Sequence, residues 1–339
     1  MAERAISVGG GRVSGNQDIR IPADHEPHTY TIMAWAVHRE WGADKEQVER
    51  ELDCVVRTIA EYERIKLLTP PDLVPAARGR KFGPEVEIVP APVDDIWMRD
   101  IAPVFAKRGT ETVAIDFNFN AWDNSRSGRA GDRLARTHDF GVPVIGMPFV
   151  GEGGAFVTDG QGLAIATRSC LQSRNPHLDE VAISEAFGRV GIRKVIWLEG
   201  DNTEPITNGH PDGYLAFLPD GKLLVEKLDI GPGSRTRGRD LDRLRHRTAD
   251  GTLKGVETLE VVPAIRLSER GSAMLVATYM NLFVSGNALL TARFSSQEDL
   301  RAEEDLKRLF PGREVRMLDV SAILNGGGGI RCLTQPVPM

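Results

Sequence analysis

Hydrophobic residues recur along this chain with two different spacings, and the two spacings alternate in blocks. Residues 44–64 and 178–190 carry apolar side chains at helical spacing, which predicts two amphipathic helices, and a third helix is predicted over 297–309. The stripe of the first helix consists of Val48, Leu52, Val55, Val56 and Ile59. Shorter apolar runs predict strands at 29–36, 85–89, 112–116, 143–147, 163–166, 194–198, 214–217, 223–225, 259–262 and 314–318. A hairpin is predicted over 282–290, around Gly286-Asn287.

Strands that alternate with helices indicate an α/β architecture. Several predicted strands come in close pairs, which a simple doubly wound parallel sheet does not need, so mixed sheets in several similar modules fit the pattern better. No linker rich in Pro or Ser divides the chain. We therefore expect a single domain over residues 21–339, preceded by a flexible, Gly-rich and polar segment at 1–20. The length of 339 residues also allows two domains, at about 150 residues each.

Charge and composition narrow the possible partners. The chain has 42 Lys and Arg against 48 Asp and Glu, a net charge of −6, and its one arginine cluster, at 235–247, is interleaved with Asp residues. That cluster is typical of a solvated helix face, and we expect no nucleic-acid partner. No apolar run approaches a membrane span, and the N-terminal residues do not resemble a signal peptide. Three scattered cysteines cannot form a disulfide framework. These features predict a soluble, cytoplasmic protein without a membrane partner.

Four short stretches combine glycine or turn residues with a reactive or charged side chain. They are DIWMRD at 95–100, GEGG at 151–154, NGHPDG at 208–213 and NGGGGIRC at 325–332. Glycine lets the backbone turn tightly or approach a ligand closely, so polar residues beside it often line clefts. The chemistry-bearing residues of these stretches are Asp100, Glu152, His210, Asp212 and Cys332.

The thiol and the imidazole each have a functional and a structural interpretation. Cys332 follows four glycines, and the neighbouring N–H groups together with Arg331 would favour a nucleophilic thiolate; the alternative is a buried structural cysteine, as we expect for Cys54 and Cys170. His210 and Asp212 stand two positions apart, so in extended backbone they face one side and suit proton transfer. The alternative there is a turn with incidental polar residues. A metal site is not expected, because one histidine and no close cysteine pair take part.

The set as a whole resembles the agmatine deiminase and bacterial peptidylarginine deiminase family of the guanidino-modifying superfamily. The matching segments, in the family's order, are PADHEPHTYTIMAW, DIWMRDIAPVF, DFNFNAW, GEGGAFVTDGQG, RNPHL, NGHPDG, YMNLFVSG and GGGGIRCLTQ, and they span about residues 21–338. The resemblance implies the pentein fold, an α/β propeller of five ββαβ-type modules around a pseudo-fivefold axis, with the site in the central channel. It also implies that no cofactor is needed, and it suggests a homo-oligomer.

The resemblance assigns a role to each candidate residue. It places the nucleophile at Cys332, the general acid/base at His210, the guanidinium-holding carboxylates at Asp100 and Asp212, and a supporting acid at Glu152. The implied activity is hydrolysis of a small cationic guanidino substrate, agmatine or a close relative, to a ureido product and ammonia through an amidino-thioether on Cys332. For agmatine the product is N-carbamoylputrescine, a step of polyamine biosynthesis.

Other features leave the substrate open. Trp35, Trp97 and Trp122 could stack on the substrate cation, although core packing accounts for each equally well. The sequence departs from the agmatine deiminase pattern at Asp123-Asn124, Ile206, Pro211, Gly213 and Arg331. Three alternatives follow: a deiminase of arginine-containing peptides, an amidinotransferase using the same covalent intermediate, and a non-catalytic binding pentein. Retention of all five candidate residues argues against the last.

Overall fold

The computed structural model describes residues 19–124, 133–204, 206–227, 234–263 and 276–339. Its strands form five small sheets. Their members, in spatial order, are β17 (Gln335–Pro338), β2 (His28–Ala34), β3 (Ile65–Thr69) and β4 (Val86–Pro90); β1 (Ile19–Arg20), β5 (Val104–Arg108), β6 (Glu111–Asp116) and β7 (Val144–Gly146); β10 (Lys194–Leu198), β9 (Leu163–Thr167) and β8 (Phe156–Thr158); β11 (Leu215–Phe217), β12 (Leu223–Glu226) and β13 (Val256–Leu259); and β14 (Phe283–Ser285), β15 (Ala288–Arg293) and β16 (Glu314–Asp319).

Helices connect and cover these sheets. The α-helices are α1 (Lys45–Ala60), α2 (Val74–Gly79), α3 (Met98–Ile101), α4 (Ala121–Asn124), α5 (Leu134–Thr137), α6 (Arg168–Arg174), α7 (Glu180–Gly188), α8 (Ser234–Ala249), α9 (Gln297–Leu309) and α10 (Ser321–Asn325). Short 3₁₀ helices include η1 (Arg39–Asp44), η3 (Pro211–Gly213) and η5 (Arg331–Leu333). None of the helices in the described ranges has the length and apolar character needed to cross a membrane.

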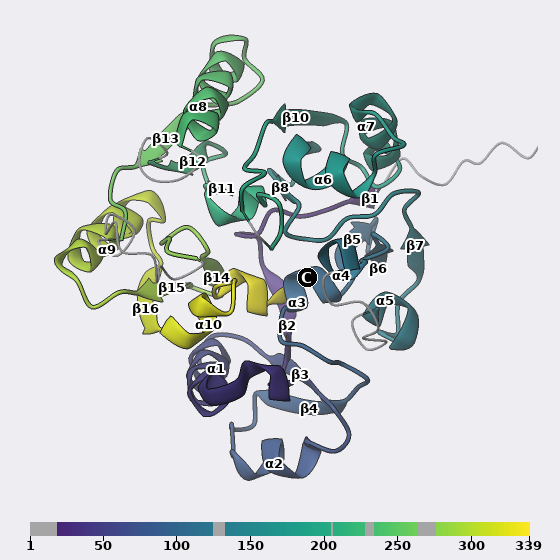
Figure 1. The fold of residues 1–339 in the computed structure, drawn as a ribbon, viewed down its shortest axis with the longest axis vertical. Helices are drawn as coiled ribbons and strands as arrows, with labels where there is room; N and C mark the ends of the chain where they lie inside the picture. Colours follow the sequence, from purple (N-terminus) through teal and green to yellow (C-terminus); the bar gives the residue numbers. More distant parts are fainter. Residues whose placement is uncertain (1–18, 125–132, 205, 228–233, 264–275) are drawn as a thin grey trace, which may run out of the picture.

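One connection pattern repeats in all five sheets. An antiparallel pair comes first, and after a helical crossover a third strand adds in parallel, as in β8–β9 followed by α6, α7 and β10. The pairs β5–β6, β11–β12, β14–β15 and β17–β2 are extended in the same way by β7, β13, β16 and β3. Figure 1 shows the five units arranged around a common centre, with the C-terminus near it. The predicted five-module arrangement is confirmed.

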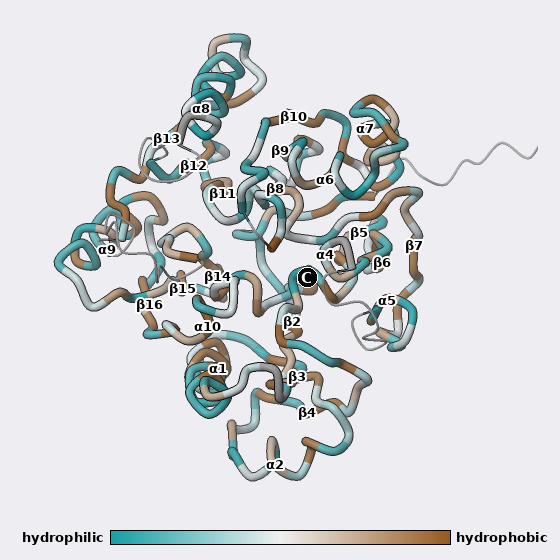
Figure 2. Tube along the Cα trace, viewed as in Figure 1, coloured by the Kyte–Doolittle hydropathy of each residue, from teal (hydrophilic) through white to brown (hydrophobic). Residues whose placement is uncertain are grey.

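The helices form where the hydrophobic spacing predicts them. The five stripe residues of α1 are fully buried, and α7 and α9 coincide with the other two predicted helices within two residues at each end. The arginine cluster lies on α8, which is mainly hydrophilic in Figure 2. Among the positions of α8 whose burial is described, 236–249, Leu244 and Asp240 are buried.

Four strands, β3, β5, β8 and β17, were not predicted from the sequence, and two boundary differences have a clear structural reason. The strand predicted at 259–262 is β13 at Val256–Leu259, because its parallel register with β12 pairs Leu223 with Val256. Ile19 and Arg20, expected in the flexible segment, form β1, because β1 pairs with β5 and buries Ile19. The remainder of that segment, residues 1–18, lies outside the described residues.

Five junctions, each joining the last strand of one sheet to the first strand of the next, carry the polar residues of the centre. They connect β4 to β5, β7 to β8, β10 to β11, β13 to β14 and β16 to β17. They contribute Asp100, Glu152, His210 with Asp212, Asn281 and Cys332, respectively. The ring of sheets therefore brings together residues that lie more than 50 positions apart in the chain.

Candidate active site

His210 is held at the end of a tight glycine turn. Gly209 has a φ of +87°, and a Cβ atom there would lie 2.4 Å from the backbone nitrogen of Asp201, so only glycine fits. Pro211 then begins η3, and this turn brings Nδ1 of His210 to 3.8 Å from Oδ1 of Asp212. The two residues share one site, as predicted, but they do so in a 3₁₀ turn and not in the extended backbone that we assumed.

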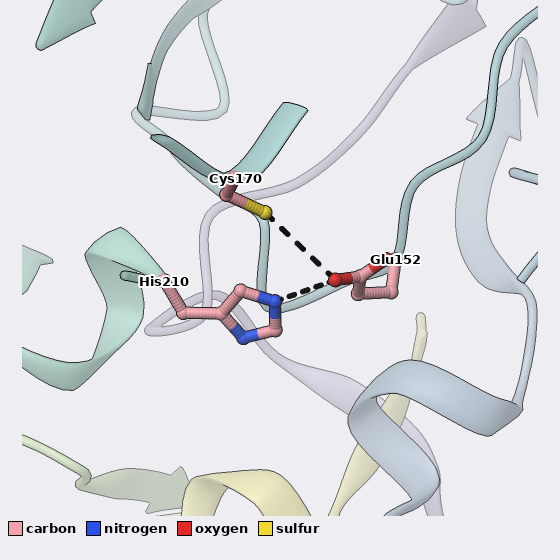
Figure 3. A group of neighbouring side chains, drawn as sticks. All are labelled: Glu152, Cys170 and His210. Carbon is pink, nitrogen blue, oxygen red and sulfur yellow. Dashed lines mark hydrogen bonds and ion pairs between the residues drawn. The ribbon is translucent and has the colours of Figure 1, made fainter. Parts of the chain in front are cut away.

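Behind His210, Glu152 forms the centre of a buried polar cluster. Nε2 of His210 lies 2.7 Å from Oε1 of Glu152, and Sγ of Cys170 lies 3.8 Å from the same oxygen (Figure 3). Arg174 forms an ion pair with that oxygen at 2.7 Å, and neither side chain of the pair is exposed. Cys170 and Arg174 both lie on α6, so this helix fixes the acid that orients His210.

The cluster drawn in Figure 3 also has the composition of a metal site. Donor atoms of Glu152, Cys170 and His210 lie within 4.8 Å of one another. However, the Arg174 guanidinium already compensates the Glu152 carboxylate, and a dication bound there would meet this positive charge directly. The donor set therefore fits a hydrogen-bonded histidine better than a metal ion.

The charges around His210 determine its protonation. Burial by itself lowers the pKa of His210, but Asp100 and the contacts with Cys170 and Glu152 outweigh burial and raise this pKa well above its ordinary value. Burial raises the pKa of Glu152, and the Arg174 and His210 charges outweigh it, so that the pKa of Glu152 is lowered. In the ligand-free site His210 is therefore an imidazolium beside an ionised carboxylate.

Asp100 approaches the site from α3. Its Oδ1 accepts a hydrogen bond of 3.0 Å from the backbone N–H of Gly154, and its Oδ2 accepts one of 2.9 Å from the indole of Trp122. Burial, partly offset by His210, and the negative charges of Glu152 and Asp212 raise the pKa of Asp100 to about 6. Asp100 is thus a carboxylate fixed by two hydrogen bonds, whose negative surroundings are only partly offset by His210.

Asn281 positions Cys332, the candidate nucleophile. The side-chain oxygen of Asn281 accepts hydrogen bonds from the backbone N–H groups of Arg331, at 2.9 Å, and Cys332, at 3.3 Å, while its amide nitrogen donates to Sγ of Cys332 at 3.1 Å. Gly329 packs so closely on this amide that a Cβ atom would lie 2.7 Å from its oxygen. Sequence analysis did not identify Asn281; its signal is a polar side chain inside the apolar run 276–284.

The surroundings of Cys332 oppose a thiolate in the ligand-free protein, in contrast to the stabilisation that we expected from its neighbours. Burial and the negative charges of Asp212 and Asp100 raise the pKa of Cys332 to about 12, against weaker stabilisation by Gly329 and Asn281. Arg331 has other partners: its guanidinium bonds Asp212, and its Nε donates to Asp24 at 2.7 Å. A cation placed between the two carboxylates would remove their part of this increase and lower the pKa of Cys332.

One pocket of about 640 Å³, part of which is open to solvent, brings His210, Asp212 and Cys332 together. Its other lining residues include Asn281, Gly328, Asp201, Glu204, Tyr214 and Arg237. Cys332 is partly exposed in it. Asp100 and Glu152 are not among the lining residues, but Glu152 contacts His210, and the charge of Asp100 acts on both His210 and Cys332.

The three tryptophans have different positions. The Trp122 indole holds Asp100. The Trp97 ring packs on the glycine loop of Cys332, where a Cβ atom at Gly328 would lie 2.4 Å from it. Trp35 donates to Asp53 at 2.9 Å and lies beneath Arg80, and it is not among the residues that line the pocket. Trp97 and Trp122 are not among those lining residues either, and all three tryptophans belong to the core, so their contact with substrate stays a prediction.

Comparison with known proteins agrees with this geometry. A Streptomyces coelicolor protein provisionally named agmatine deiminase is 30% identical over 336 residues, covering 94% of this chain and 98% of that protein. The agmatine deiminase of Ectopseudomonas mendocina is 27% identical over 354 residues, covering 94% and 95%. The solved agmatine deiminase of Enterococcus faecalis matches with a TM-score of 0.85 at 24% identity, over 96% of this chain and 99% of that one. The fold is therefore the pentein fold predicted from the sequence.

The strongest evidence for family membership is the extent of the match to a single family model. The model described as Porphyromonas-type peptidyl-arginine deiminase matches residues 20–338, which include all five junctions and every candidate residue of the pocket. This chain belongs to the Porphyromonas-type peptidyl-arginine deiminase family.

Proposed function

We propose that this protein is a guanidine deiminase, a hydrolase that converts agmatine or a close relative to the ureido product and ammonia. The observation that carries the proposal is the convergence of the Cys332 thiol and the His210 imidazolium on one pocket, with the carboxylates of Asp212 and Asp100 beside them. A guanidinium is a planar cation with N–H groups along its edges, so paired carboxylates bind it through charge-assisted hydrogen bonds.

In the first half of the reaction, Asp100 and Asp212 hold the guanidinium with its carbon facing Cys332. The substrate's positive charge offsets the two carboxylates that add to the effect of burial on the pKa of Cys332, so this pKa falls and the thiol releases its proton to solvent when substrate binds. The thiolate attacks the guanidino carbon and forms a C–S bond. His210 then gives its proton to the departing nitrogen, the C–N bond breaks and ammonia leaves.

In the second half, a cationic amidino-thioether remains on Cys332. Neutral His210, oriented by Glu152, takes a proton from water, and the resulting hydroxide attacks the same carbon. The C–S bond then breaks, which releases the ureido product and regenerates the sulfur anion. Every step uses side chains of this chain as acid, base or nucleophile.

Product analysis tests the proposal. The purified protein is incubated with agmatine, arginine and an arginine-containing peptide, and ammonia and ureido product are measured. We expect stoichiometric ammonia and ureido product from at least one small guanidino compound. Ammonia from the peptide alone would identify a peptidyl-arginine deiminase instead. Transfer of the amidine to an added amine without ammonia would identify an amidinotransferase, and no reaction with any of them would refute the proposal.

The pH dependence of kcat/KM should show an acid limb near pH 6. Below its pKa of about 6, Asp100 takes up a proton and loses the charge that holds the guanidinium, so kcat/KM falls as the pH falls. Trp122→Phe removes a hydrogen bond that favours the ionised carboxylate, so this limb should move to higher pH. A profile that is flat between pH 5 and 7, or a limb that Trp122→Phe leaves in place, would contradict this role of Asp100.

A further inference from the structure

A second pocket, of about 470 Å³, lies beside the catalytic pocket and shares none of its lining residues. Arg331 separates the two, because its guanidinium bonds Asp212, which lines the catalytic pocket, and Asp24, which lines the second one. The strands β2, β5 and β17 each contribute to the wall of the second pocket, and they meet near the centre of the ring of sheets (Figure 1). Part of this wall is apolar and consists of Ile21, Val104, Phe105, Phe156, Pro336 and Pro338.

Arg99 also lines this pocket, and two of its donors are unused. The residue is only 4% exposed, and its Nε and Nη2 make no hydrogen bond within the described part of the chain. Its Nη1 donates to Asp24 at 3.3 Å. Gly153 packs against the same side chain, since a Cβ atom at Gly153 would lie 3.1 Å from Cδ of Arg99. A buried donor without a partner costs free energy, which a bound acceptor would recover.

Positive charge exceeds negative charge in the wall of this pocket. Its charged lining residues are Asp24, Arg99 and Arg331, so two guanidiniums share one carboxylate. Asp24 repels an added anion, but it is engaged more closely by Arg331, at 2.7 Å, than by Arg99. Burial and the charge of Arg331 lower the pKa of Arg99, although Asp24 and Asp212 act in the opposite direction. The charge of Arg99 is therefore only partly compensated by the protein.

We propose that this second pocket is a binding site for a small organic carboxylate, which is held by Arg99 and is separate from the substrate site. The N–H groups of Nε and Nη2 point in parallel from one edge of a guanidinium, and this edge matches the two oxygens of a carboxylate. The apolar part of the wall suits a short hydrocarbon chain, as in small-molecule sites where a few polar groups fix the orientation. The inference goes beyond the deiminase proposal and does not depend on it.

Calorimetric titration with butyrate tests the proposal. At constant ionic strength the wild-type protein should bind one butyrate with a Kd of about 1 mM or tighter. Butyramide and butylamine keep the hydrocarbon chain but lack the negative charge, and neither should bind in this range. No binding of butyrate at about ten times that concentration would overturn the proposal. Inorganic phosphate binding as tightly as butyrate, with the same dependence on Arg99, would exclude an organic carboxylate as the ligand class.

A second titration identifies the source of the carboxylate. Butyrate is compared with a short N-acetylated peptide of apolar residues that has a free C-terminus. Tighter binding of butyrate supports a free acid as the ligand, and tighter binding of the peptide supports a chain end. Amidation of the peptide's C-terminus should abolish its binding. If the amidated peptide bound equally well, its carboxylate would not be recognised.

Variants assign the binding to the guanidinium edge. Arg99→Lys keeps the positive charge but lacks the paired donors, and Arg99→Met lacks both; each should weaken butyrate binding at least tenfold. Arg108→Met removes a positive charge from the other end of β5, where Arg108 pairs with Glu111, and should leave the affinity unchanged. Wild-type affinity in Arg99→Lys would overturn the proposal.

Pro336→Trp provides a test that leaves the buried Arg99 in place. Pro336 lines the pocket on the edge strand β17 and is partly exposed, so a larger ring there fills the pocket. This variant should lose butyrate binding while its thermal unfolding midpoint stays close to that of the wild type. Undiminished binding of butyrate by a folded Pro336→Trp protein would place the ligand elsewhere and overturn the proposal.

Competition with agmatine distinguishes the second pocket from the catalytic one. Cys332→Ala, which cannot turn agmatine over, is titrated with butyrate in the absence and in the presence of excess agmatine. We expect the butyrate Kd to stay within threefold, since the two pockets share no lining residue. Loss of butyrate binding in agmatine would put both compounds in one site and overturn the inference. If the wild-type protein hydrolyses no guanidino compound, the deiminase proposal fails, while Arg99-dependent butyrate binding still supports the second site.

Discussion

Cys332→Ala should abolish turnover, with a loss of at least ~10⁴-fold in kcat, because the covalent step has no other sulfur to use. Cys332 is the cysteine that lines the pocket, and its backbone and thiol are both held by Asn281. The substrate should still bind, since Asp100 and Asp212 are unchanged. The measurements are ammonia release, calorimetric binding and the thermal unfolding midpoint.

Two further experiments test whether Cys332 is the cysteine that reacts. Cys54→Ala, at an exposed position of α1, should retain full activity. In the wild-type protein, a rapid acid quench during turnover should yield an amidino adduct that peptide mass spectrometry locates at Cys332. Turnover by Cys332→Ala, or an adduct on Cys170, would exclude Cys332 as the nucleophile.

Gly154→Ala should lower kcat by ~100-fold or more without changing the overall fold. A Cβ atom at this position would lie 2.4 Å from Nδ1 of His210 and 2.8 Å from Oδ1 of Asp100, both shorter than any real contact. Both neighbours are buried, so one of them must shift, and a displacement of about 1 Å in a reacting geometry costs about 10²-fold. Steady-state kinetics and circular dichroism measure the two effects.

Gly213 offers the matched control. It lines the same pocket, but a Cβ atom there would meet nothing within 4 Å. Gly213→Ala should therefore keep kcat within a few-fold of wild type. If Gly154→Ala retained wild-type kcat, the tight packing of His210 against Asp100 would have no catalytic importance.

The helices and strands that could be predicted from the sequence are those whose apolar residues follow a local pattern and form a buried face. The stripes of α1, α7 and α9 and the hairpin of β14 and β15 are local patterns, and they were found. β17 was not predicted, because Pro336 and Pro338 argue against a strand. It forms nonetheless at the edge of its sheet, where β2 pairs with one side only. Nothing in the local sequence reveals that this partner lies 300 residues away.

The reactive side chains of the site were predictable, but most of their partners were not. Motifs identify Asp100, His210 and Cys332 because glycines and turns surround them. The ion pair of Arg174 with Glu152, and the bond from Arg331 to Asp212, join segments that meet only when the ring of sheets has formed. The same holds for the raised pKa of Cys332, which depends on burial and on charges from other junctions. Charge effects of this kind follow from distances in space, not in sequence.

The placement of one polar group at each of the five junctions has a consequence for partial structures of this protein. A fragment that contains the chemistry must span at least residues 100–332, because Asp100 and Cys332 lie at the two ends of that range. Local opening of any single sheet would displace the polar side chain or pair of side chains at its junction and disable the others. A substitution that destabilises any one of the five sheets, even far from the pocket, is therefore expected to lower activity as well.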